Sequence, residues 1–283
     1  MTLVAVTGVT GQVGRLVASD LQQDAADLRL VVRDRTRLPP GIDGEVVAAS
    51  YGDGPSARRA LQGVDLLFMV SGAESVDRLA QHRTFVEAAA EAGVRHVVYT
   101  SFLGASPDAT FTLARDHWHT EQYLRSSGMA WTFLRDSLYL DLLPAFAGED
   151  GVIRGPADDG RFGGVARADV ARVATTVLRE PEAHAGATYD LTGPEAITLD
   201  EAAATITRVT GREYRFENET LEGAYASRAV YGAPQWQLDA WVSTYVAIAR
   251  GELAAVTDTV ERLTGRRPLS LADVLAELPE GRR

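Results

Sequence analysis

Three glycines stand three residues apart near the start of the chain, in the segment VTGVTGQVG at residues 6–14. Glycines at such a spacing let the backbone turn tightly off a strand, approach a phosphate group and begin a helix close to a sheet. The first N–H groups of that helix lack backbone partners, and the positive end of its dipole favours an anion. The spacing G-x-x-G-x-x-G therefore favours a site for the pyrophosphate of a dinucleotide, and a plain turn is the alternative. The residues expected there are Gly8, Thr10, Gly11, Gln12, Val13 and Gly14.

An arginine follows at the position that distinguishes the two nicotinamide dinucleotides. A second apolar run, Leu28–Val32, leads into Arg33, which lies 19 residues after Gly14. Units that bind NAD carry an acidic residue about 20 residues after the glycines, whereas an arginine suits the 2′-phosphate of NADP. Asp34 is an acidic alternative, and the run RDRTR is also compatible with a solvated loop. We expect Arg33 and Arg37 to bind NADP(H) in preference to NAD(H).

Strands and helices alternate over the first 135 residues. Short continuous apolar runs are typical of buried parallel strands, and apolar residues at helical spacing separate them. Gly93 and Gly128 are expected to end two of the helices. This alternation predicts an α/β fold with a doubly wound parallel sheet. The expected strands are Leu3–Val6, Leu28–Val32, Glu45–Ala49, Asp65–Val70, Val94–Thr100 and Met129–Leu134, and expected helices include Ser56–Gln62, Ser75–Ala92 and about Asp108–Ser127.

The alternation breaks after Arg135, where the chain becomes rich in turns and then mostly helical. We therefore expect a nucleotide domain at residues 1–135, rejoined by about 165–192, and a smaller lobe at 136–164 and 193–283. Ligands of doubly wound sheets lie outside the carboxyl ends of the strands, so a substrate cleft is expected between domain and lobe. The segments predicted for this part are helices at Leu138–Phe146, at Ala168–Arg179 and from Leu199, two short strands within 148–164, and strands at Thr188–Leu191 and Tyr214–Phe216.

Composition excludes several chemistries. The chain has 283 residues, of which 46% are hydrophobic and 24% are charged, as in ordinary globular proteins. It has no cysteine, and all 28 basic residues are arginines, so thiolate sites, Schiff-base lysines and P-loop lysines are excluded. The net charge of −11 opposes binding to nucleic acid, and no apolar run reaches the roughly 20 residues of a membrane helix. We expect a cytoplasmic monomer or homodimer that acts on a small molecule, without a metal, nucleic-acid or membrane partner.

Several segments together resemble one protein family. They are VTGVTGQVG (6–14), VVRD (31–34), YGD (51–53), QHRTFVEAAAEAGVRHVVYTS (81–101), HWHTEQYLRSSGMAWTFLRDSLY (117–139) and RADVA (167–171). In these segments, which cover most of the chain up to about residue 200, the sequence is similar to NmrA-like atypical short-chain dehydrogenases/reductases. The branch it resembles includes NADPH:quinone oxidoreductases and triphenylmethane reductase. The resemblance implies an NAD(P)-binding Rossmann fold with a smaller, mostly helical C-terminal lobe, and hydride transfer to quinone-like or conjugated acceptors.

The resemblance also shows which catalytic groups this chain lacks. Classical members protonate their substrate with a tyrosine activated by a lysine four residues on, assisted by a serine after the fifth strand. Here Leu113 stands at the tyrosine position and His117 at the lysine position, while Ser101 is retained. His117 is the candidate acid or orienting group, because imidazole titrates near neutrality, and a purely structural role is the alternative. Ser101 and Tyr139 are expected to shape the site with it.

Other residues have both a functional and a structural interpretation. A Tyr-Gly-Asp turn explains Asp53 as well as contact with the adenine does. His82 either positions a loop near the cofactor or caps a helix, and Asp136, where the branch commonly has asparagine, is a candidate N-cap. The cofactor residues expected beyond the glycine loop and the arginines are Tyr51, Asp53, Val70, Ser71 and Thr100. An aromatic cluster in the lobe either lines a pocket for a flat substrate or forms the lobe's core, and comprises Tyr231, Trp236, Trp241 and Tyr245.

Two functions fit these observations. The first is an NADPH-dependent oxidoreductase that transfers hydride to a quinone or similar conjugated acceptor. The alternative is a non-catalytic NADP(H)-sensing regulatory protein of the NmrA-like type. The missing tyrosine–lysine pair is compatible with both, and it disfavours isomerase or dehydratase chemistry on a nucleotide sugar.

Overall fold

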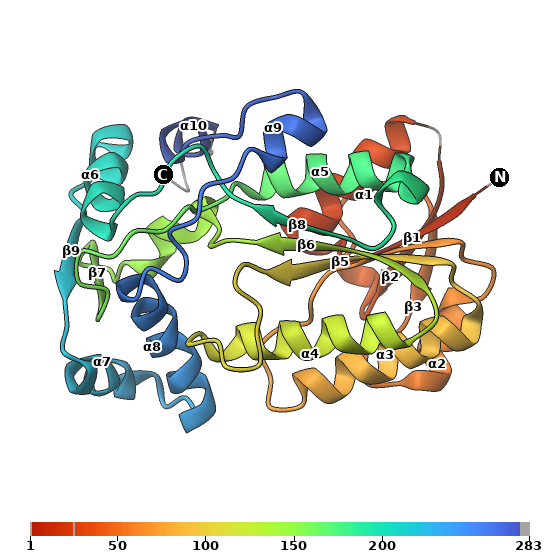
Figure 1. Cartoon of the computed structure of the whole chain (residues 1–283), viewed down its shortest axis with the longest axis horizontal. Coiled ribbons are helices and arrows are strands. Elements are labelled where there is room, and N and C mark those ends of the chain that lie inside the picture. Colours follow the sequence, from red (N-terminus) through yellow and green to blue (C-terminus); the bar gives the residue numbers. More distant parts are fainter. Residues whose placement is uncertain (1, 25, 278–283) are drawn as a thin grey trace. The chain divides into compact units, whose positions relative to one another are not determined.

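Short runs of aliphatic and β-branched residues form one seven-stranded parallel sheet (Figure 1). The structure is a computed structural model that describes residues 2–24 and 26–277, so the ends of the predicted domain ranges, residue 1 and residues 278–283, lie outside it. Four residues of the central run Leu66–Met69 are all buried, as expected for a strand covered on both faces. The strands are β1 (Leu3–Thr7), β2 (Asp27–Val32), β3 (Glu45–Ala48), β4 (Leu66–Met69), β5 (His96–Phe102), β6 (Ala130–Asp136) and β8 (Ala187–Leu191).

Helices cover both faces of this sheet, so the predicted doubly wound Rossmann fold is confirmed. The helices are α1 (Gln12–Gln23), α2 (Gly54–Leu61), α3 (Arg78–Ala92), α4 (Thr112–Ser126) and α5 (Arg167–Arg179). In Figure 1, α1 and α5 lie on one face, and α2, α3 and α4 lie on the other. On the second face, Leu61, Phe85 and Leu124 from the three helices pack in one buried cluster with Tyr99 and Phe133 of the sheet.

The strand order reverses beside β1. The sheet runs β3-β2-β1-β4-β5-β6-β8, so β1 has β2 on one side and β4 on the other, and it pairs in parallel with both. The connections after β1 and β4 therefore leave the sheet in opposite directions. In open α/β sheets this reversal opens a crevice at the carboxyl ends of the two strands, which is where ligands bind.

Contacts between Cα atoms divide the chain into two units. The first comprises Met1–Pro107, Asp116–Arg135 and Val170–Tyr189, and the second comprises Asp108–Arg115, Asp136–Asp169 and Asp190–Arg283. One of these boundaries lies between Arg135 and Asp136. Residues 108–115, which the sequence pattern assigns to the nucleotide domain, belong to the second unit.

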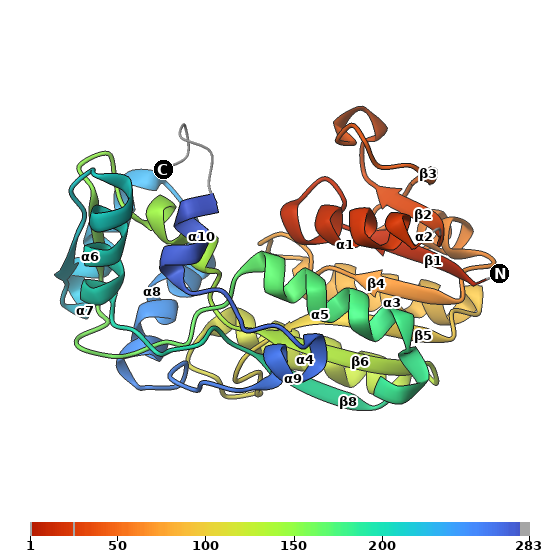
Figure 2. The same ribbon diagram turned by 90° about the horizontal axis from the view of Figure 1, so that it is seen from above.

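The second unit combines a two-stranded sheet with short helices. Its strands β7 (Val152–Gly155) and β9 (Arg215–Asn218) pair in parallel. Its helices after β8 are α6 (Leu199–Thr210), α7 (Leu221–Arg228), α8 (Gln235–Ala249), α9 (Thr259–Thr264) and α10 (Leu271–Glu277). Helix α6 contacts β9 and α10, and α7 contacts α8. Figure 2 shows α6 and α10 beside each other. Within the described residues, no helix of the chain combines the length and the apolar character that a membrane span requires.

Three local predictions for this unit were wrong in detail. The segment expected to be helical at Leu138–Phe146 is a 3₁₀ helix at Leu140–Phe146 that contains Pro144, which lacks the N–H of an α-helix. Of the two strands expected within 148–164, one is β7, and the other contributes a single bridge from Phe162 to Ile197. The four aromatic residues of the lobe do not form a common core, because Tyr245 is buried whereas Tyr231 is 67% exposed and contacts Trp241 by its edge.

Candidate active site

The glycine loop joins β1 to α1 and leaves room only for backbone. Gly8 has a φ of +66°, which an L side chain rarely adopts, and a Cβ there would lie 2.8 Å from Cβ of Val70 at the end of β4. A Cβ on Gly14 would lie 2.5 Å from the Thr7 carbonyl oxygen, so α1 lies directly against β1. The N-cap of α1 is Gly11, which provides no side chain to satisfy the first N–H groups. These features fit the pyrophosphate of NAD(P)H, bound by the first turn of α1.

The arginines after β2 are exposed, whereas the acidic residue between them has a structural role. Oδ1 of Asp34 accepts hydrogen bonds from the backbone N–H of Thr36 at 2.9 Å and from its hydroxyl at 2.6 Å. These two bonds hold the pKa of Asp34 below its usual value and cap the 3₁₀ turn Arg35–Arg37. Burial raises the pKa of the Tyr51 phenol, and Arg33 lies close enough for its positive charge to oppose this rise. The geometry therefore favours Arg33 over Asp34 as the residue that meets the adenosine ribose.

Tyr51 connects the ends of β1 and β4 through its hydroxyl. The hydroxyl donates to the carbonyl of Val70 at 2.6 Å and lies 2.7 Å from Oγ1 of Thr7, while its ring stacks on Phe85 with 4.1 Å between centroids. Burial raises the pKa of Tyr51 well above its usual value, so the phenol is neutral. Only the half-buried ring remains to meet an adenine. Asp53 is the N-cap of α2 and accepts from Ser56, as in the structural interpretation of the Tyr-Gly-Asp turn.

The ends of β4 and β5 are tied together beside the glycine loop. The backbone N–H of Ser71 donates to Oγ1 of Thr100 at 2.8 Å, and the N–H of Val70 donates to Oγ1 of Thr7 at 2.9 Å. Thr100 is buried. These contacts bring Val70, Ser71 and Thr100 together at the carboxyl edge of the sheet, where the sequence predicts the nicotinamide ribose.

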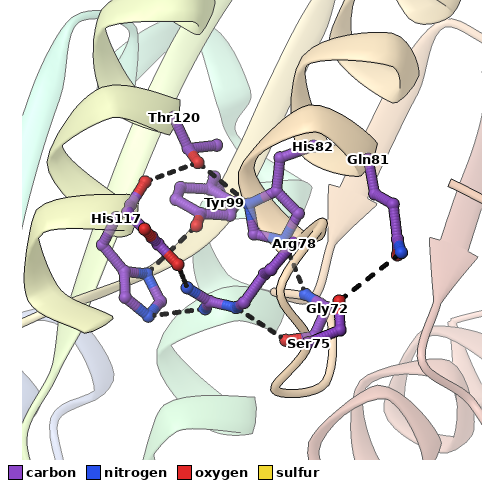
Figure 3. Close-up of polar contacts among 9 residues, drawn as sticks. Gly72, Ser75, Arg78, Gln81, His82, Tyr99, His117 and Thr120 are labelled. Carbon is purple, nitrogen blue, oxygen red and sulfur yellow. Dashed lines mark hydrogen bonds and ion pairs between the residues drawn. The ribbon is translucent and has the colours of Figure 1, made fainter. Parts of the chain in front are cut away.

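The loop after β4 is held at Gly72 by two side chains of α3 (Figure 3). Nε2 of His82 accepts from the Gly72 N–H at 2.8 Å, and Nε of Arg78 donates to the Gly72 carbonyl at 2.9 Å. Because Nε2 of His82 accepts, its ring proton is on Nδ1, which lies 2.9 Å from the Thr120 hydroxyl. Burial lowers the pKa of His82 to about 3, so the ring is neutral. His82 therefore positions this loop and does not cap α3, whose N-cap is Asp77.

His117 is buried on α4, and both of its ring nitrogens are engaged. Nε2 lies 2.9 Å from Nη2 of Arg78, and Nδ1 lies 3.0 Å from the Tyr99 hydroxyl (Figure 3). A guanidinium only donates, so Nε2 accepts and the ring proton is on Nδ1. Burial, reinforced by the charge of Arg78, lowers the pKa of His117 well below its usual value. The geometry therefore favours an orienting role for His117 over that of a proton donor at neutral pH.

Arg78 is a site residue that the sequence patterns do not predict. Its side chain is 4% exposed, and besides Gly72 and His117 it contacts Asp116, with Nη1 3.2 Å from Oδ2 of that carboxylate. The available signal is an arginine at the start of an expected helix, three residues before the family-matching segment at residue 81. That signal is weak, because the partners of Arg78 on α4 are 38 and 39 residues away in sequence.

Ser101 belongs to a buried ionic group. Its hydroxyl donates to Oε1 of Glu121 at 2.6 Å, and Arg135 donates to Oε1 and Oε2 of the same carboxylate at 2.8 Å each. Glu121 is fully buried. The proton of Ser101 is therefore used within the protein, and a ligand would meet only the lone pairs of this hydroxyl.

Tyr139 contacts Asp136, which is the last residue of β6. The Tyr139 hydroxyl donates to Oδ2 of Asp136 at 2.7 Å. The following 3₁₀ helix has no side-chain cap, so Asp136 is not the N-cap that the sequence suggested. Asp136 is 2% exposed, and burial raises its pKa to about 8 although the hydrogen bond from Tyr139 opposes this change. Burial also raises the pKa of Tyr139 well above its usual value.

The described part of the chain contains no cluster of three or more His, Asp or Glu side chains arranged to hold a metal ion. The residues discussed above instead define a Rossmann protein that binds a nicotinamide dinucleotide. The sequence profile of a family described as NAD(P)H-binding matches residues 8–181, and the chain belongs to this family.

Known relatives agree with this assignment. Quinone oxidoreductase 2 of Escherichia coli K12 is 33% identical over 98% of each chain, and its structure with NADPH matches with a TM-score of 0.86 over 96% of this chain and 98% of that one. A (4-alkanoyl-5-oxo-2,5-dihydrofuran-3-yl)methyl phosphate reductase of Streptomyces griseus is 37% identical over 98% of each chain. Citrobacter triphenylmethane reductase with NADP(H) is 30% identical, with a TM-score of 0.85 over 96% of this chain and 98% of that one. The resemblance noted from the motifs is confirmed, and the protein is an NAD(P)H-dependent oxidoreductase.

Proposed function

We propose that this oxidoreductase uses NADPH to reduce a quinone or a related conjugated carbonyl compound. The observation that carries the proposal is the lack of the usual acid, since the chain has no lysine and has Leu113 at the tyrosine position. His117, at the lysine position, is neutral and bonded at both ring nitrogens. An acceptor that takes hydride readily suits such a site. The relatives named for a quinone and for an unsaturated furanone support this class of acceptor. Likeness to regulators of the NmrA type extends only to the fold.

Each part of the cofactor site has a separate role in this proposal. Bound NADPH supplies the hydride. The backbone of the glycine loop binds the pyrophosphate, Arg33 and Arg37 neutralise the 2′-phosphate, and the ring of Tyr51 lies at the adenine. Around the nicotinamide, the loop held by His82 and Arg78 gives the site a fixed wall. Ser101 and His117 shape the acceptor site by position.

The proposal is tested by following NADPH oxidation with a panel of benzoquinones, naphthoquinones and unsaturated lactones. We expect turnover with at least one of these compounds and none with simple saturated ketones, whose reduction needs a strong acid at the carbonyl oxygen. Tight binding of NADPH without turnover of any conjugated acceptor would instead support a sensor of the cofactor.

Replacing Arg33 with alanine should weaken NADPH binding by about 10- to 100-fold, because one charge-assisted pair with the 2′-phosphate contributes about 1.5–3 kcal/mol. The affinity for NADH should remain unchanged, since NADH carries a hydroxyl at that position. Dissociation constants from nicotinamide fluorescence measure both effects. Arg59→Ala, at an exposed arginine of α2, is the matched control. An unchanged affinity of Arg33→Ala for NADPH would remove Arg33 from the site.

A further inference from the structure

Side chains hold almost every polar backbone group of residues 70–72, the half-buried loop that follows β4. At Gly72, His82 accepts from the N–H and Arg78 donates to the carbonyl. The carbonyl of Ser71 is the exception, because among the described residues it has no hydrogen-bond partner. The partners of the other three backbone groups are Thr7, Tyr51 and Thr100. This loop therefore offers one free backbone acceptor to a ligand.

The peptide group between Ser71 and Gly72 is fixed at one end and free at the other. Its N–H donates to Nε2 of His82, and in a trans peptide the carbonyl points in the opposite direction. A Cβ added to Gly72 would lie 3.1 Å from Nε2 of His82, so the backbone fits closely against this ring. The free Ser71 carbonyl therefore points away from His82, which is buried on α3.

Arg78 fixes the next peptide group and joins it to α4 (Figure 3). Its Nε donates to the Gly72 carbonyl, its Nη2 to Nε2 of His117, and its Nη1 lies 3.2 Å from Oδ2 of Asp116. A guanidinium is a rigid planar fork, so these three contacts cannot change independently. Because Arg78 is 4% exposed, a displaced Gly72 would leave a buried donor without its partner. The loop is thus held rigidly to two helices.

We propose that Arg78 is a positioning residue for hydride transfer, because it holds the peptide whose free Ser71 carbonyl accepts a hydrogen bond from a hydroxyl of the nicotinamide ribose. Ligands of such sheets bind where the strand order reverses, and this loop follows β4 at that point. It also adjoins the glycine loop, since a Cβ on Gly8 would lie 2.8 Å from Cβ of Val70. Arg78 acts on the cofactor through Gly72, so this role goes beyond the proposed function and applies to any hydride acceptor.

Single-turnover kinetics of Arg78→Met separate positioning from binding. The rate of NADPH oxidation by a naphthoquinone should fall about 100-fold, as expected when a reacting group is displaced by about 1 Å. The dissociation constant of NADPH should change little, because the glycine loop and Arg33 bind the other half of the cofactor. Arg29→Met is the matched control and should leave both quantities unchanged. Arg29 is also largely buried, and its partners are Glu45 and the carbonyls of Ala60 and Gln62, which precede β4.

Two further variants test the guanidinium itself. In Arg78→Ala, added guanidinium ion should restore part of the hydride-transfer rate, whereas urea, which has a similar shape and no charge, should not. Arg78→Lys keeps a positive charge beside Asp116, yet one nitrogen atom cannot replace three. This variant should fold even if Arg78→Met does not, and it should lose hydride transfer while it retains NADPH affinity.

The fluorescence lifetime of bound NADPH is a readout that needs no acceptor. A nicotinamide that is held less firmly has a shorter lifetime, so Arg78→Lys should shorten it and Arg29→Met should not. An unchanged rate and lifetime in Arg78→Lys, an equal loss in Arg29→Met, or equal rescue by urea would leave Arg78 a structural residue. If the wild type oxidises NADPH with no acceptor, the proposed function fails, and the lifetimes alone then decide the role of Arg78.

Discussion

The stability of Asp136→Asn relative to wild type is expected to grow as the pH rises from about 4 to about 8. Folding raises the pKa of Asp136 from 3.8 to about 8, because the carboxyl group is buried. Between these values the folded state holds a proton that the unfolded state has released, so wild-type stability falls as the pH rises. Asparagine has no such proton. At about 1.36 kcal/mol per pKa unit, the difference accumulates to about 6 kcal/mol.

Chemical denaturation of both proteins at a series of pH values measures this effect. The free energy of unfolding of Asp136→Asn relative to wild type should rise across this window and stay constant above pH 8. The buried amide of the variant changes the free energy of unfolding by an amount that does not depend on pH. The slope of the difference in this free energy against pH therefore reports the ionisation of Asp136. Asp159→Asn, at an exposed aspartate, serves as control, with no slope expected. Parallel curves for wild type and Asp136→Asn would mean that Asp136 is ionised in the folded protein.

Replacing Arg135 with methionine should destabilise the protein by about 3–5 kcal/mol. The carboxylate of Glu121 is fully buried, and the guanidinium of Arg135 donates to both of its oxygens. The variant would leave the buried carboxylate of Glu121 with one described hydrogen-bond donor, the Ser101 hydroxyl. Removing one partner of a buried ion pair costs far more free energy than removing one partner of an exposed pair. Thermal or urea unfolding gives the magnitude.

Two further variants test whether the burial of the pair causes the loss. Arg83→Met breaks an exposed ion pair with Glu87 and should cost less than about 1 kcal/mol. Adding Glu121→Gln to Arg135→Met removes the unpaired charge and should restore most of the stability. Equal losses in Arg83→Met and Arg135→Met would show that burial of Glu121 does not matter.

Local patterns in the sequence are sufficient to predict the fold and the glycine turn between β1 and α1. Runs such as Leu66–Met69 are apolar throughout, and only a sheet covered on both faces buries every residue of such a strand. Gly8 and Gly14 can be predicted from local sequence because Gly8 adopts a positive φ, and because a Cβ on Gly14 would meet the backbone of Thr7 and Gly8 a few residues before it. Arg33 is predictable because it directly follows a strand.

The proton chemistry depends on contacts that no local pattern contains. His117 is a sensible acid by residue type, yet a donor 39 residues away on α3 occupies its Nε2, and burial keeps its ring neutral. Asp136 reads as a helix cap, because a short polar residue before a helical pattern usually is one. Its burial at the end of β6 instead makes it a neutral acid with a free oxygen among the described residues.

Sequence alone therefore determined the sheet, the dinucleotide loop and the absence of a tyrosine–lysine pair, since these depend on residue type and on neighbours along the chain. Tertiary structure alone decided which side chains hold or release protons. A pKa depends on burial and on the partners brought together by folding, and for His117 and Asp136 these come from how the chain packs around them.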